Sequence, residues 1–96
     1  MKKQQYKICI SGGSEGENAE RAYHLARKIG ETVAKLGHVL ITGATNGVPY
    51  EAAKAAKKAG GSNIGFSPAG TEIEHQKKFR LPMDPEIFDH IILLFK

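Results

Sequence analysis

The stretch that decides the fold spans residues 38–60 and reads HVLITGATNGVPYEAAKAAKKAG. Its apolar run at 38–42 predicts a strand. A loop from Gly43 to Gly47 follows and opens a helix that has Pro49 in its first turn, where proline is favoured. The helix is expected to run to about residue 59 before Gly60 ends it. A strand, a tight loop and a helix in this order are the building unit of a parallel α/β sheet.

A second unit of this kind precedes the first. Residues 6–11 form a short apolar run that ends at Gly12, which predicts a strand. From about residue 18 to 36, apolar residues recur at helical spacing between charged ones, and Gly37 ends this amphipathic helix. Its start admits two interpretations, and both stay open: a capping box of Ser14 with Glu17, or Asn18 as the N-cap.

Two further strands are expected towards the C-terminus, over 63–67 and 91–95, with a loop or a short helix at 71–80 between them. The whole pattern is β-α-β-α-β-(α)-β. We therefore predict an α/β fold of the Rossmann-like three-layer type, with a short parallel sheet in strand order 3-2-1-4 that is truncated after the fourth strand.

Length and composition favour a single water-soluble domain. The chain has 96 residues, of which 41% are hydrophobic and 25% charged, values typical of globular proteins. We expect one Rossmann-like nucleotide-binding domain over residues 1–96, incomplete because the fourth strand is followed only by Lys96. Either the chain is part of a longer domain, or a second subunit covers this strand.

The cellular location follows from what the sequence lacks. No run approaches the roughly 18 apolar residues of a membrane span, and the N-terminus has no signal-peptide pattern. The single cysteine, Cys9, lies in an apolar run and is expected to be a buried, reduced thiol. We expect a cytoplasmic protein that has no membrane partner.

Three loops rich in glycine and hydroxyl residues follow the first three expected strands. The carboxyl ends of parallel strands meet at one edge of a sheet, where ligands of open α/β sheets bind. Glycines and hydroxyls are also what any tight turn requires, yet three such loops on one edge favour a phosphate-bearing ligand. We predict a nucleoside monophosphate-like ligand, with the candidate binding residues Ser11, Gly12, Gly13, Ser14, Thr42, Gly43, Ala44, Thr45, Asn46, Gly47, Ser67 and Pro68.

Charge distinguishes the first two loops. Glu15, Glu17 and Glu20 crowd the first, whereas residues 42–50 contain no acidic residue. Because carboxylates repel phosphate, we expect the second loop to hold the phosphate and the first to contact the sugar or the base. Neither of the common glycine-rich nucleotide motifs is present.

Other kinds of site have little support. The four histidines lack the spacing of metal ligands, so we predict neither a metal site nor a cofactor. Glu72, Glu74 and His75 are expected to be solvated rather than catalytic. The formal charge of +4 and the cluster Lys77, Lys78 and Arg80 leave single-stranded nucleic acid as an alternative partner, for which binding must weaken with salt.

Several of these segments occur together in a known family. They are Ile-Ser-Gly-Gly-Ser at 10–14, Gly-His-Val-Leu-Ile-Thr-Gly-Ala at 37–44, Gly47 and Gly-Phe-Ser-Pro-Ala at 65–69. In order and spacing they resemble the LOG-like family, often labelled lysine-decarboxylase-like. That family belongs to the wider Rossmann superfamily, which also includes a DNA-processing branch. The resemblance covers nearly the whole chain.

The resemblance implies a nucleotide ligand. Typical LOG proteins are phosphoribohydrolases that cleave the base from a nucleoside 5′-monophosphate, with the signature Pro-Gly-Gly-x-Gly-Thr-x-x-Glu after the fourth strand. Here Leu94 and Phe95 are followed only by Lys96, so that signature is not carried over. The resemblance also implies Arg80 as the catalytic candidate, since the family places an arginine before this strand.

The sequence thus predicts a nucleotide-binding module without catalysis of its own. The alternative is that it forms part of a LOG-like phosphoribohydrolase. The dimers usual among LOG-like proteins also imply a homo-oligomer.

Overall fold

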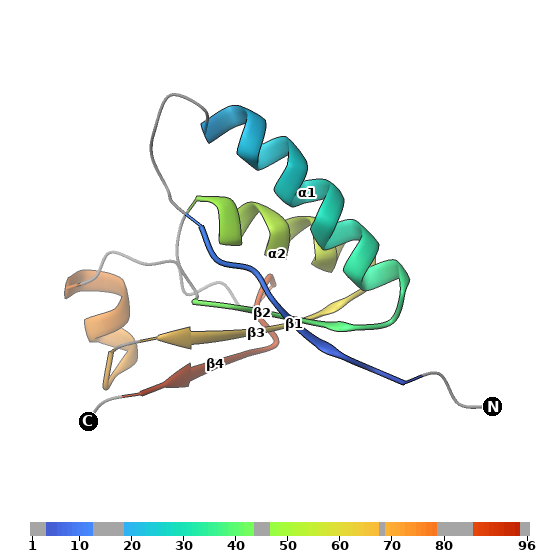
Figure 1. Ribbon diagram of the computed structural model, residues 1–96. Coiled ribbons are helices and arrows are strands. Elements are labelled where there is room, and N and C mark those ends of the chain that lie inside the picture. The colour runs from blue at the N-terminus through green and yellow to red at the C-terminus, as the bar shows by residue number, and fades with distance from the viewer. Residues whose placement is uncertain (1–3, 13–18, 44–46, 68, 79–85, 95–96) are drawn as a thin grey trace.

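The computed structural model describes residues 4–12, 19–43, 47–67, 69–78 and 86–94. It contains four strands, two α-helices and one short π-helical segment (Figure 1). In chain order these are β1 (Lys7–Cys9), α1 (Ala19–Lys35), β2 (Val39–Thr42), α2 (Val48–Lys58), β3 (Ser62–Ser67), η1 (Glu74–Lys78) and β4 (His90–Leu93). The α/β class and the alternation of elements are confirmed, and the expected ends of the two long helices differ from the observed ones by one residue.

The four strands form one parallel sheet in the order β1-β2-β3-β4. The predicted order 3-2-1-4 is therefore wrong. It assumed that the chain crosses back over β1 after β3, but β4 instead pairs with β3, with Ile64 opposite His90 and Ser67 opposite Leu93. Hydrophobic periodicity shows that a strand is present but carries no information about which neighbour it joins.

Asp89, directly before β4, ties this strand to its neighbours. One of its carboxylate oxygens accepts a hydrogen bond from the backbone N–H of Asn63 at 2.7 Å, and the other lies 2.5 Å from Nζ of Lys57 in α2. The buried Asn63 side chain in turn donates to the carbonyl oxygens of Ala53 and Ile87. These bonds join the segment before β4 to β3 and α2, in keeping with the pairing of β4 with β3.

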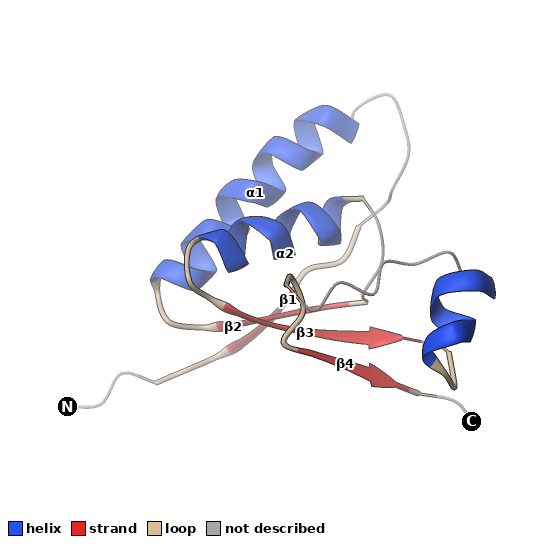
Figure 2. Cartoon of the chain, turned by 180° about the vertical axis from the view of Figure 1, so that it is seen from behind, coloured by secondary structure: helices blue, strands red, loops and turns tan. Residues whose placement is uncertain are grey.

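Both long helices cover the same face of the sheet (Figures 1 and 2). Each connection from β1 to β3 advances by one strand in the same direction, so that both crossovers lie on one side. The segment η1 lies beyond the ends of β3 and β4 and does not cover the other face (Figure 2). The described elements therefore make two layers of the expected three. Among them, no helix is long and apolar enough to cross a membrane.

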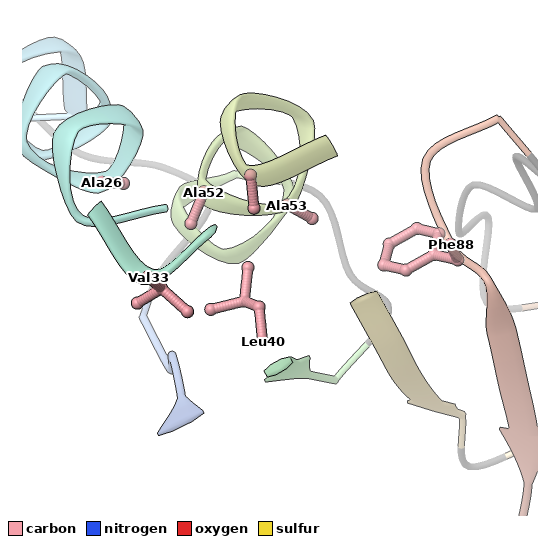
Figure 3. Packing of buried hydrophobic residues seen from close by; sticks show 7 residues of the cluster. Ala26, Val33, Leu40, Ala52, Ala53 and Phe88 are labelled. Atoms are coloured by element: carbon pink, nitrogen blue, oxygen red, sulfur yellow. The ribbon is translucent and has the colours of Figure 1, made fainter. Parts of the chain in front are cut away.

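The core between sheet and helices is built largely from small side chains. Leu40 of β2 points towards Ala52 and Ala53 of α2, and Val33 of α1 closes the cluster (Figure 3). The helices pack closely because Gly30 lies against the backbone of α2, where a Cβ atom would be 2.1 Å from the carbonyl oxygen of Ala52. Phe88 covers the opposite end of the cluster.

Cys9 differs from expectation, because it is exposed rather than buried. It pairs with Ile41, which pairs with Ile64 in the next strand. Alternate strand residues point to opposite faces, so all three belong to the face turned away from α1 and α2. The prediction failed because it assumed that both faces of the sheet are covered. The two interpretations of the start of α1, with Ser14 or Asn18 as its cap, lie outside the described residues.

Candidate functional site

A hollow of about 370 Å³ lies where β1 and β2 end. Four of the predicted binding residues line it: Ser11, Gly12, Thr42 and Gly43. The fold brings them together because Cys9 pairs with Ile41 in parallel register, and the backbone N–H of Ile10 extends the pairing by donating to the Ile41 carbonyl at 2.9 Å. The first two loops therefore leave the sheet side by side.

Gly12 sits where the first loop passes the start of α2. A Cβ atom at this position would lie 3.0 Å from Cγ1 of Val48, closer than ordinary van der Waals contact. A larger residue would push the loop away from α2 and change the shape of the hollow. Glycine at this position thus permits the close approach of the loop backbone to α2.

The N-terminus of α2 lies beside the hollow, and Pro49 of its first turn lines the wall. Gly47 is the N-cap, with φ of 84°, and no side chain among the described residues caps the helix. The first amides of a helix have no partner within it, and they carry the positive end of the helix dipole. Pro49 has no N–H, so backbone donors for an anion on this side of the hollow come from its neighbours in the first turn.

Glu51 is the acidic residue of the first turn of α2, and two cations neutralise it. Its carboxylate lies 2.9 Å from the Arg27 guanidinium of α1 and 3.0 Å from Nζ of Lys54. Burial raises the pKa of Glu51, but the hydrogen bonds and charges of Lys54 and Arg27 outweigh it and hold this pKa below its ordinary value. The paired Glu51 carboxylate therefore repels an anion at the helix N-terminus less than an unpaired carboxylate would.

The remaining wall of the hollow is largely apolar. Besides Pro49, it consists of Cys9, Ile10, Ile41 and Phe66. An aromatic ring beside aliphatic side chains is a suitable surface for a planar heterocycle. Sequence reasoning missed these residues because each lies within an apolar strand, where the pattern indicates core. Their alternation along the strand was the signal that could have placed Cys9, Ile41 and Phe66 on one face.

Ser67, another predicted ligand residue, does not line this hollow. It is fully buried, its Oγ lies 2.5 Å from Nδ1 of His75, and it accepts a hydrogen bond from the backbone N–H of Ala69 at 3.1 Å. These contacts fasten η1 to the end of β3. His75 is also fully buried, so the expectation that it is solvated is wrong, whereas Glu72 is exposed as expected.

Several predicted site residues lie outside the described part of the chain: Gly13, Ser14, Ala44, Thr45, Asn46, Pro68 and Arg80. Within the described ranges, no group of three histidine, cysteine or acidic side chains is placed to hold a metal ion. The geometry of the site therefore rests on the described ends of the first two loops and on the start of α2.

Comparison with known proteins assigns the chain to a family. The model of the SLOG cluster4 family matches residues 5–90 of the chain. The chain belongs to the SLOG cluster4 family. This membership supports the LOG-like kinship that the loop sequences suggested.

Solved structures similar to this SLOG cluster4 chain include the molybdenum cofactor carrier protein from Chlamydomonas reinhardtii. Two of its structures give TM-scores of 0.74 and 0.75 at 28% identity, and they match 94% and 95% of this chain. The X-ray structure of TM1055 is similar in fold, with a TM-score of 0.69 at 17% identity over 95% of this chain. These matches support the Rossmann-like architecture.

This SLOG cluster4 chain is shorter than its relatives. It spans 49% and 51% of the two carrier-protein chains and 48% of the TM1055 chain. An uncharacterised protein of Archaeoglobus fulgidus is 43% identical over 53 residues, which make up 55% of this chain and 35% of that protein. The chain thus corresponds to about half of each solved relative.

Proposed function

We propose that the chain is a binding module for a small phosphorylated heterocycle of the nucleoside monophosphate class. The observation that carries the proposal is the hollow of about 370 Å³, which brings Ser11 and Gly12 together with Thr42 and Gly43 beside the N-terminus of α2. Its volume falls within the range of about 300 to 1,000 Å³ that is usual for small-molecule sites.

In this proposal the phosphate lies on the α2 side. Backbone amides at the start of α2 supply donors there, and the cations beside Glu51 reduce the negative charge. The heterocycle lies against the exposed face of the sheet, on Ile41 of β2 and Phe66 of β3. The role of this chain is binding, and no residue in the hollow is assigned to catalysis.

The molybdenum cofactor is a second candidate ligand. It is favoured by the likeness to the carrier protein, which is 28% identical and matches 94% and 95% of this chain in two structures. A pterin phosphate also combines a planar heterocycle with an anion, so the same division of the hollow would serve it. The two candidate ligands therefore differ in their heterocycle, whereas the phosphate of each would bind on the α2 side of the hollow.

A substitution at Gly43 tests the phosphate side. Gly43→Asp places a carboxylate in the hollow, and AMP affinity measured by calorimetry is expected to fall at least tenfold through charge repulsion. Ser62→Asp adds the same charge at the exposed opposite end of β3 and is expected to leave the affinity unchanged. Circular dichroism is used to check that both variants are folded.

The outcomes separate the candidates. Equal AMP affinity in folded Gly43→Asp and in the original chain would refute the phosphate assignment. If AMP does not bind, but the chain retains molybdenum cofactor released from a molybdoenzyme and Gly43→Asp does not, the cofactor replaces the nucleotide as the ligand.

A further inference from the structure

A second hollow lies along α1. Its volume is also about 370 Å³, and it is lined by Ile8, Lys28, Ile29, Thr32, Val33 and Leu36. The edge strand β1 forms its floor through Ile8, and the outer side of α1 forms its wall. It shares no lining residue with the proposed ligand site.

The apolar residues around this hollow form a stripe on the helix. Leu25, Ile29 and Leu36 are 59%, 38% and 61% exposed, although all three are large and hydrophobic. Leu25 and Ile29 are four residues apart and lie on one face of α1, and Leu36, the residue after the helix ends, lines the hollow together with Ile29. A continuous apolar stripe that faces solvent is typical of a contact surface for another polypeptide.

A row of basic residues borders the stripe. Arg21, Lys28 and Lys35 are seven residues apart, so they lie in line along α1, and all three are exposed. Lys35 lies 2.5 Å from Glu31, which balances its charge. Arg21 and Lys28 form no ion pair with a described carboxylate, so the margin of the stripe keeps a positive charge.

We infer that this groove binds an amphipathic helix of another protein. The apolar face of that helix is flanked by carboxylates. The ridge of such a helix fits between α1 and β1, its leucine-like side chains cover Leu25, Ile29 and Leu36, and its carboxylates face the basic row. Charge complementarity of this kind contributes mainly to specificity and association rate.

The charge row argues against a second copy in this groove. In an antiparallel pairing about a two-fold axis, the row of Arg21 and Lys28 would lie beside its own symmetry mate, which is repulsive. A membrane surface is also a poorer fit, because a flat bilayer does not fill a hollow between a helix and a strand. An acidic helix satisfies both the shape and the charge.

The test uses two synthetic helical peptides of about 20 residues with the same leucine seam, one flanked by glutamates and the other by lysines. Fluorescence anisotropy is expected to show binding of the glutamate peptide alone, weakened by salt. Leu25→Ser and Lys28→Glu are each expected to weaken binding about tenfold. Both residues are exposed, so the fold is expected to persist.

Matched controls carry the same changes elsewhere. Ile73 is 67% exposed and Lys77 is exposed, both outside the groove, so Ile73→Ser and Lys77→Glu are expected to leave binding unchanged. Absence of peptide binding, or equal loss in the control variants, overturns the inference. So does a dimer that Leu25→Ser dissociates, or tighter binding to phosphatidylserine vesicles than to the glutamate peptide.

Discussion

Gly30 lies where α1 crosses the backbone of α2, and the close packing of the two helices depends on it. A Cβ atom there would meet the Ala52 carbonyl oxygen at 2.1 Å, so Gly30→Ala must push the helices apart. We expect a loss of about 1 to 3 kcal/mol in the free energy of unfolding, measured by urea denaturation. Thr32→Ala, at an exposed position of the same helix, is the control. An unchanged or higher stability in Gly30→Ala would contradict this packing.

The Ser67 and His75 pair is expected to be structural. Ser67→Ala removes the hydroxyl that bonds with Nδ1 of the buried His75 and accepts from the Ala69 N–H. We expect a loss of about 1 to 3 kcal/mol in the free energy of unfolding, because buried polar groups lose a partner. AMP affinity is expected to stay unchanged, since Ser67 does not line the hollow. A loss of affinity without a loss of stability would make Ser67 a binding residue instead.

At the scale of single residues, sequence reasoning identified loop positions better than side-chain environments. Ser11, Gly12, Thr42 and Gly43 were predicted to meet, and they line one hollow, because parallel strands deliver their following residues to one edge. His75 was expected in solvent, yet it is buried. Histidine occurs in both environments, and a polar neighbourhood in sequence does not show what the fold packs against it.

At the scale of elements, β4 depends on an acid-sensitive contact. Burial raises the pKa of Asp89, but the hydrogen bonds from Lys57 and from the Asn63 N–H outweigh it and hold this pKa below its ordinary value. A carboxylate with a lowered pKa in the folded state stabilises the fold above its unfolded pKa of about 4 and loses that contribution as the pH falls further.

Asp89→Asn is therefore expected to lower the unfolding free energy at pH 7 by about 0.5 to 1 kcal/mol, a modest value because the ion pair with Lys57 is partly exposed. The difference from the original chain is expected to shrink as the pH falls below about 4, as measured by denaturation at several pH values. Glu72→Gln changes an exposed carboxylate and serves as control. A difference that grows in acid would contradict the ion pair.

The long elements were predictable because each has a strong local signal. The apolar periodicity of residues 18–36 and the alanine-rich segment that opens with Pro49 gave both helices within one residue at either end. The strand β1 is shorter than expected, Lys7–Cys9 instead of residues 6–11, since pairing with a four-residue neighbour limits its length. Boundaries set by a partner strand are not encoded locally.

At the scale of the whole molecule, strand order and layers were not predictable from this chain. Periodicity identified β4, but its pairing with β3 joins segments that are far apart in sequence, as do the contacts of Asp89 with Lys57 and Asn63. The face of the sheet opposite the helices bears exposed Cys9, and Ile92 of β4 is 42% exposed. The chain corresponds to about half of its solved relatives.

Homo-oligomerisation remains a prediction at this scale. If the sheet face around Ile92 mediates it, light scattering is expected to show a concentration-dependent increase in mass that Ile92→Ser reduces, because that side chain is 42% exposed on β4. Leu25→Ser, on the α1 groove, is expected to leave self-association unchanged. A monomer at all concentrations up to the millimolar range would contradict the prediction.

The central claim is that a phosphorylated heterocycle binds where β1 and β2 end, and an NMR titration of the folded chain with AMP tests it most directly. Adenosine and inorganic phosphate are titrated separately, so that the part of the site that binds the heterocycle is distinguished from the part that binds the phosphate. The account predicts that AMP shifts the backbone amides of Ser11, Gly12, Gly43 and Gly47, and that phosphate alone shifts the α2 side first. Saturating AMP that leaves all of these amides unmoved, or that shifts only amides near η1, would contradict it.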